Sequence, residues 1–133
     1  MAIFVTDTHP LWWYATGQLR RLSPRALRAF QMADEDRGLI YIPAVVLWEI
    51  SLLLKIGRLR VDQPFSSWMD LLLAQRGFDL APLEPSVIAA ALGLGDIADP
   101  FDAAIMATAL ARDLPLITKD ERITRARIVD IFW

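Results

Sequence analysis

Residues 39–54 have the sequence LIYIPAVVLWEISLLL, an almost unbroken apolar stretch that contains one acidic residue, Glu49. The stretch is shorter than the roughly 20 residues that a membrane-spanning helix needs, and Pro43 divides it. Proline is suited to the first turn of a helix, where its missing N–H costs nothing. We therefore expect a short buried strand over Leu39–Ile42, followed by a helix that begins at Pro43 or Ala44, and no membrane span.

The rest of the chain alternates between strands and helices in the same way. Strands are predicted over residues 2–6, 39–42, 78–83, 114–118 and 128–132. Helices are predicted after residues 7–10 and over residues 23–35, 64–74, 85–92 and 101–112. Strands without polar alternation, separated by helices, are typical of a parallel sheet covered on both faces. The predicted fold class is α/β, a three-layer α/β/α sandwich with a central parallel sheet.

Composition narrows the class of protein. The chain has 133 residues, 55% of them hydrophobic and 23% charged, which predicts one folded domain over residues 1–133. The absence of cysteine excludes thiolate zinc sites and fits a reducing cytoplasm. The opening MAIFVTD has no basic region and is not expected to be a signal peptide. With a net charge of −2, any contact with nucleic acid must come from local basic patches.

Four acidic residues stand at the end of an apolar run or inside one: Asp7, Glu49, Asp102 and Asp120. Burying an unpaired carboxylate is costly, so such a group normally has a cation or hydrogen-bond donors beside it. A hard divalent metal ion bound by oxygen ligands is the natural partner. Sites in parallel sheets form beyond the carboxyl ends of the strands, and Asp7 and Asp120 follow two predicted strands closely.

The two helical acids are expected to point toward the protein interior. At about 100° per residue, Glu49 lies nearly opposite the polar face formed by Ser51 and Lys55. Asp102 shares a stripe with Ile105 and Met106 by the same arithmetic.

Each acid also has a purely structural interpretation. Asp7 could cap the following helix, and Asp99 before Pro100 has the pattern of a helix N-cap. Asp120 could be an ordinary turn residue. Glu49 has the weakest structural explanation, because a buried glutamate without a partner is rare.

Four motifs resemble those of one family, the PIN-domain ribonucleases. They are FVTDTH at residues 4–9, LWEI at 47–50 followed by KIGRL at 55–59, DPFD at 99–102 running into IMATA at 105–109, and LITKD at 116–120. Their order and the chain length are similar to those of VapC-type toxins of type II toxin–antitoxin pairs. The resemblance covers essentially the whole chain and implies the PIN-like sandwich predicted above.

The resemblance also implies roles for particular residues. Asp7, Glu49 and Asp102 match the family's metal-binding acidic core, with Asp99 as an additional acid beside it. Asp120 matches a fourth acidic position, although the Lys119-Asp120-Glu121 sequence departs from the Arg-Asn common there. The expected cofactor is Mg²⁺, with Mn²⁺ as a substitute, and the expected reaction is hydrolysis of RNA phosphodiester bonds. A hydroxyl from Thr8 or Thr118 could join the site.

Basic and aromatic residues indicate where RNA and protein partners would bind. Arg58 and Lys119 lie closest to the motifs and are the predicted phosphate contacts, whereas the single histidine, His9, is more typical of a capping or surface residue. Trp12 and Trp13 are adjacent on a helix and hard to bury together, which favours an additional interface. By resemblance the expected partners are a cognate antitoxin and a second copy of the chain.

Other functions remain open at this point. A phosphatase of the haloacid dehalogenase type would need a second aspartate two residues after Asp7, where this chain has His9. A nucleotide-binding domain would need a glycine-rich loop after the first strand, and none follows. The stronger alternative is a catalytically weak PIN-like module that binds RNA or protein.

Overall fold

The computed structural model describes residues 1–133 and contains one five-stranded sheet in the order β3-β2-β1-β4-β5. The strands are β1 (Ala2–Thr6), β2 (Gly38–Pro43), β3 (Phe78–Ala81), β4 (Leu116–Ile117) and β5 (Ile131–Phe132). Every pair of neighbouring strands is parallel. The predicted parallel sheet is therefore confirmed.

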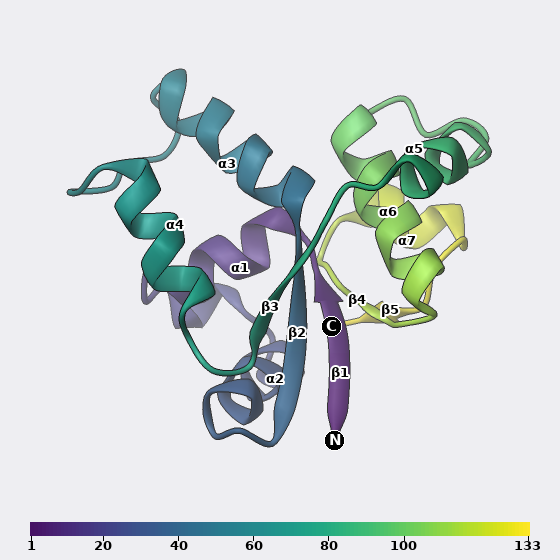
Figure 1. Cartoon of the computed structure of the whole chain (residues 1–133). Coiled ribbons are helices and arrows are strands. Elements are labelled where there is room, and N and C mark those ends of the chain that lie inside the picture. The colour runs from purple at the N-terminus through teal and green to yellow at the C-terminus, as the bar shows by residue number, and fades with distance from the viewer.

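Helices cover the sheet from two sides. They are α1 (Thr8–Ala15), α2 (Pro24–Asp34), α3 (Ala44–Lys55), α4 (Phe65–Leu73), α5 (Pro85–Leu92), α6 (Pro100–Arg112) and α7 (Glu121–Ala126), with a 3₁₀ turn at Leu19–Arg21. Figure 1 shows α1 to α4 on one side of the strands and α5 to α7 on the other. This arrangement confirms the three-layer α/β/α sandwich.

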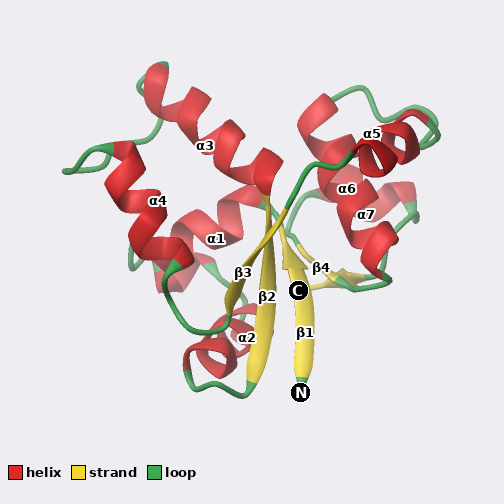
Figure 2. Cartoon of the chain, viewed as in Figure 1, coloured by secondary structure: helices red, strands yellow, loops and turns green.

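The apolar stretch at residues 39–54 forms β2, inside the sheet, and α3, which extends outward from the end of β2 (Figure 2). Ile40 and Ile42 of β2 are fully buried between β1 and β3. Pro43 ends the strand and caps α3, so the chain passes from strand to helix without a loop. No helix in the structure is long and apolar enough to cross a membrane.

The last third of the chain differs from the predicted elements in detail. The predicted strand at residues 114–118 is shorter because the Leu114 N–H bonds to the Ala109 carbonyl, after Asp113 has turned left-handed at the end of α6. The predicted strands at 78–83 and 128–132 are also shorter, ending at Ala81 and beginning at Ile131. Helix α7 was not predicted, since its polar sequence has little apolar periodicity.

The tryptophans are distributed unevenly between core and surface. Trp12 and Trp68 are buried, with ring centroids 5.3 Å apart. Trp13 is partly exposed, so the adjacent pair Trp12 and Trp13 is not buried together. Trp48 is 58% exposed, and its ring makes an edge contact with the Phe101 ring, with centroids 5.2 Å apart.

Candidate active site

Asp7 stands where β1 passes into α1 and is held from two directions. Its Oδ1 accepts a 2.7 Å hydrogen bond from the Thr8 backbone N–H, which makes it the N-cap of α1. Its Oδ2 accepts a 2.7 Å hydrogen bond from Thr118 Oγ1 at the end of β4. Since β1 and β4 are parallel neighbours, their carboxyl ends meet. Asp7 is thus both a cap and part of a cluster, and the two interpretations are compatible.

Glu49 reaches the same place from α3. Its side chain is half-buried, and its Oε1 accepts a hydrogen bond from Thr8 Oγ1. The Thr8 backbone therefore binds Asp7 while its hydroxyl binds Glu49. One threonine links the end of β1 to the third helix and sets the relative position of the two carboxylates.

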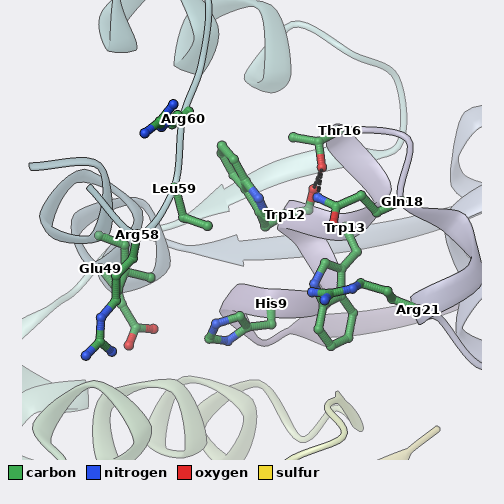
Figure 3. Close-up of a pocket in the computed structure, with 11 residues that line it drawn as sticks. His9, Trp12, Trp13, Thr16, Gln18, Arg21, Glu49, Arg58, Leu59 and Arg60 are labelled. Carbon is green, nitrogen blue, oxygen red and sulfur yellow. Dashed lines mark hydrogen bonds between the residues drawn. The ribbon is translucent and has the colours of Figure 1, made fainter. Parts of the chain in front are cut away.

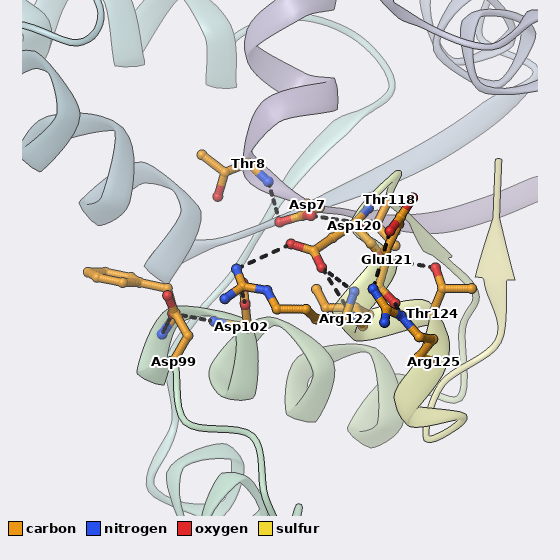
Figure 4. A network of polar contacts seen from close by, with 12 residues as sticks. Asp7, Thr8, Asp99, Asp102, Thr118, Asp120, Glu121, Arg122, Thr124 and Arg125 are labelled. Carbon is orange, nitrogen blue, oxygen red and sulfur yellow. Dashed lines mark hydrogen bonds and ion pairs between the residues drawn. The ribbon is translucent and has the colours of Figure 1, made fainter.

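Asp99 and Asp102 come from the first turn of α6. Asp99 caps the helix as predicted, accepting hydrogen bonds from the N–H groups of Phe101 at 2.8 Å and Asp102 at 3.1 Å. The Asp102 side chain is only 15% exposed, and its Oδ2 lies 3.7 Å from Arg122 Nη2. Figure 4 shows the carboxylates of Asp7, Asp102 and Asp120 gathered around this arginine.

Asp120 is the N-cap of α7. Its Oδ1 accepts hydrogen bonds from the N–H groups of Arg122 and Ile123, at 2.8 and 3.2 Å. Its own N–H donates to Thr118 Oγ1 at 3.0 Å, and its Oδ2 lies 3.7 Å from Arg122 Nη2. Thr118 therefore ties the Asp120 backbone to the Asp7 side chain, and Arg122 bridges Asp102 and Asp120.

The carboxylates share one electrostatic environment. Burial, followed by repulsion from Asp99, Asp7 and Asp120, raises the pKa of Asp102 to about 7. Burial also raises the pKa of Asp7, although the hydrogen bonds from Thr118 and Thr8 oppose this. The pKa of Glu49 is raised by burial and by the nearby charges of Asp7 and Asp99. Burial is the largest cause of each of these shifts, and repulsion between the acids adds to it. Only Arg122 forms ion pairs with the cluster, so its carboxylates are incompletely neutralised.

The carboxylates of the cluster suit a hard divalent cation, because every atom that they could offer as a ligand is an oxygen. Arg122 is the one cationic side chain that forms an ion pair with any of these acids. As the side chains stand, however, no three acidic or histidine groups converge closely enough to hold a metal ion. The acids lie close together, and Arg122 alone offsets their negative charge. The carboxylates of Asp7 and Glu49 accept hydrogen bonds from Thr118 and Thr8 instead of pointing toward a common ion.

The predicted phosphate contacts flank this cluster. Lys119 lines a small cavity of about 180 Å³ together with Asp7 and Asp120. Arg58 lines a larger cleft of about 670 Å³ on the side of Glu49. The sequence did not single out Arg122 as a site residue, because its position depends on α7, which was not predicted. Recognising Asp120 as a helix N-cap would have placed Arg122 in the first turn of that helix, beside the acids.

Comparison with known proteins identifies the class to which this fold and site belong. The model of the PIN domain family matches residues 4–129, and the chain therefore belongs to the PIN domain family. The chain is 30% identical over 129 residues to Ribonuclease VapC22 of Mycobacterium tuberculosis, covering 96% of this chain and 94% of that protein. The resemblance to VapC-type PIN proteins that the four motifs predicted is confirmed.

Solved structures with the same fold include two toxin–antitoxin assemblies. DNA-bound VapBC from Salmonella typhimurium has a TM-score of 0.70 at 14% identity, over 98% of this chain and 97% of the other. VapBC2 from Rickettsia felis, bound to a promoter DNA fragment, has a TM-score of 0.69 at 15% identity, over 97% and 96% of the two chains. At these identities the likeness concerns the fold.

Proposed function

We propose that residues 1–133 form one PIN nuclease domain that acts as a metal-dependent endoribonuclease, the toxin of a toxin–antitoxin pair. The observation that carries the proposal is the under-neutralised carboxylate cluster at the carboxyl edge of the sheet, where the pKa of Asp102 rises to about 7. The 30% identity to a protein named as a ribonuclease supports the choice of RNA as substrate.

In this proposal Asp7, Glu49 and Asp102 hold Mg²⁺ or Mn²⁺, with Asp99 as a further ligand. A bound divalent ion would acidify water and neutralise charge on the phosphate. Thr118 and Thr8 orient the carboxylates of Asp7 and Glu49 through the hydrogen bonds described above. Asp120 completes the catalytic group by positioning Arg122 and adding negative charge beside Asp102.

Substrate and partners are part of the same proposal. Arg58 and Lys119 flank the acids and would contact the RNA backbone on either side of the cleaved bond. Thr8, the third predicted substrate contact, is completely buried with its hydroxyl bound to Glu49, so it would orient that acid rather than touch RNA. The structural neighbours include toxin–antitoxin assemblies, which supports a cognate antitoxin as the protein partner. We further propose a homodimer and a cytoplasmic location, in keeping with the absence of cysteine.

A second candidate function is a catalytically weak PIN module that binds RNA or protein. One observation favours it: no three of the acids converge to hold a metal ion in the present conformation. The nuclease proposal requires Glu49 and Asp7 to turn from their threonine partners toward a common ion. Glu49 is partly accessible, whereas Asp7 is buried and would have to exchange its Thr118 hydrogen bond for the ion within the fold.

Cleavage of a mixed pool of structured and single-stranded RNA tests the proposal directly. The purified chain is compared in Mn²⁺, Mg²⁺ and EDTA, together with Asp7→Asn and with Asp62→Asn, an exposed aspartate outside the cluster, as the matched control. Discrete products that require metal, persist in the control and vanish in Asp7→Asn would support the nuclease. Absence of cleavage by the folded, antitoxin-free chain in any metal would favour the binding module.

A further inference from the structure

A cleft of about 670 Å³ opens beside the acidic cluster, between α1 and the segment that follows α3. Its wall nearest the cluster carries Glu49 and His9, and its outer parts carry Arg21, Arg58 and Arg60. Figure 3 shows the His9 ring standing between Glu49 and Trp13, with the arginines around it. The volume falls within the range of about 300–1,000 Å³ that small-ligand sites occupy.

The arginines of the cleft are exposed and have no acidic partner. None of Arg21, Arg58 and Arg60 forms an ion pair, although the chain as a whole carries a net charge of −2. Other arginines of this protein, such as Arg37 and Arg125, pair with neighbouring glutamates. Three unpaired guanidinium groups around one cleft of an acidic protein make a local site for anionic groups.

Two aromatic side chains, His9 and Trp13, line the cleft together with these arginines. The rings of His9 and Trp13 lie 5.9 Å apart, and the Arg21 guanidinium lies 5.4 Å from the Trp13 ring centroid. His9 is exposed and Trp13 is partly exposed, so both offer ring surface to the cleft. Aromatic rings next to cationic side chains are the combination that binds nucleobases together with their phosphates.

The cleft continues into the acidic cluster. A second cavity of about 180 Å³ is lined by the same two aromatic residues and by Asp7, Lys119 and Asp120. The Lys119 ammonium lies 5.8 Å from the Trp13 ring centroid. His9 and Trp13 therefore line both the cleft that holds the arginines and the cavity that holds Lys119 and the carboxylates.

We propose that this cleft is a subsite for one unpaired ribonucleotide next to the cleaved phosphodiester bond. Its base packs against the His9–Trp13 wall, and the backbone phosphates on its far side contact Arg58 and Arg60. The inference rests on the proposed nuclease function and adds a substrate preference to it. A base must leave its helix to enter the cleft, so the RNA is single-stranded at this nucleotide.

Binding measurements separate the contribution of the base from that of the phosphates. Fluorescein-labelled decamers of single-stranded RNA are compared with abasic decamers of the same charge, by fluorescence anisotropy in EDTA. The wild-type chain should bind the base-bearing decamer roughly tenfold more tightly, since each stacked base contributes about that factor or more. His9→Ala should remove most of this preference while leaving binding of the abasic decamer within about twofold.

Arg60→Ala should act differently, weakening both decamers equally. It should also lower the slope of log affinity against log salt by about 0.7, as expected for one phosphate contact to a single strand. Arg76→Ala is the matched control, because Arg76 is exposed and lies in the loop before β3, paired with Asp36. His9 and Arg60 are both exposed, and unchanged melting temperatures would show that the variants fold.

The outcomes distinguish the subsite from the nuclease. An equal affinity of the wild-type chain for the two decamers, or a base preference that survives in His9→Ala, would overturn the subsite. Metal-dependent cleavage that persists alongside such a result would leave the proposed nuclease function standing. Loss of base preference in His9→Ala, in a chain that cleaves no RNA, would support base binding by the cleft but overturn both the nuclease and the place of the subsite beside a cleaved bond. RNA binding unaffected by every variant would assign the cleft to another occupant, such as a peptide segment of a partner.

Discussion

Thr118 Oγ1 donates a 2.7 Å hydrogen bond to Asp7 Oδ2, joining two residues separated by 111 positions in the chain. The same oxygen accepts the Asp120 N–H at 3.0 Å, and Thr118 is completely buried. The hydroxyl thus holds the first acid and the backbone of the last acid in one arrangement. Partners of this kind orient the ligands of metal sites.

Thr118→Val should reduce the proposed cleavage by about 10- to 100-fold, the usual cost of losing a partner that orients a metal ligand. The hydrogen bond from Thr118 opposes the rise in the pKa of Asp7, so its removal raises that pKa further. The acidic limb of the pH–rate profile should therefore move to higher pH. Thr108→Val is the control, since Thr108 is equally buried but bonds to the Ala104 carbonyl within α6. A profile that keeps its position would contradict the orienting role.

Asp102→Asn should stabilise the metal-free protein at neutral pH. The folded-state pKa of Asp102 is about 7, above its ordinary value of 3.8, so the folded chain binds more protons than the unfolded chain between these values. The free energy of unfolding therefore decreases as the pH rises through this window. The asparagine variant lacks this dependence, because its side chain does not ionise.

Thermal melting in EDTA measures this difference. At about pH 8 the Asp102→Asn variant should melt several degrees above the wild type, since 1 kcal/mol moves the midpoint of a small domain by about 4 °C. At about pH 4 the two midpoints should approach one another, because Asp102 is then protonated in the folded wild type. Asp62→Asn retains Asp102 and should melt with the wild type at both pH values. Equal midpoints of Asp102→Asn and the wild type at both pH values would mean that neither burial nor the acidic neighbours raise the pKa of Asp102.

Added Mn²⁺ should stabilise the fold and release protons. A ligand that binds the folded state alone at 100 times its Kd raises the free energy of unfolding by about 2.7 kcal/mol. Protons are released because Asp102, with its pKa of about 7, must ionise to bind a cation. Asp7→Asn and Glu49→Gln should each reduce the rise in melting temperature, whereas Asp62→Asn should retain it. An unchanged melting curve with Mn²⁺ would argue against an acidic metal site.

Lys119→Glu should weaken RNA binding and lower its salt dependence. Lys119 lines the cavity that contains Asp7 and Asp120, where a phosphate would approach the acids. Removing one phosphate contact to single-stranded RNA lowers the salt slope by about 0.7. Arg58→Glu should act in the same way, and Arg76→Glu serves as the matched charge reversal. An unaltered slope in Lys119→Glu, measured by titration at several salt concentrations, would refute the contact.

Most of the secondary structure was predictable from short stretches of sequence, because apolar runs, prolines and helix caps act on only a few neighbouring residues. The apolar run over residues 39–42 becomes β2, and Pro43 marks the boundary with α3. Asp99 before Pro100 predicted the cap of α6. The failures have a local cause as well. Helix α7 has a polar sequence and follows Asp120, whose capping role was not recognised.

The candidate site was predictable only in part. Carboxylates inside or after apolar runs cannot all be solvated, and this reasoning selected Asp7, Glu49, Asp102 and Asp120 as a group. In the structure, burial and then the charges of Asp99, Asp7 and Asp120 raise the pKa of Asp102, while the catalytic role of these residues stays a prediction. The contacts that hold them were not predictable, since the side-chain directions of Thr8, Thr118 and Arg122 depend on neighbouring elements.

The sequence by itself determined the order of strands and helices and which acids lie near the strand ends, because burial and proline act on the chain locally. The tertiary structure alone decided that β4 lies beside β1, which brings Thr118 to Asp7. It also decided that α7 carries Arg122 between Asp102 and Asp120, and that α1 and the end of α3 enclose a basic cleft. These contacts join residues far apart in the chain, and such pairings are set by packing of the whole core rather than by any local pattern.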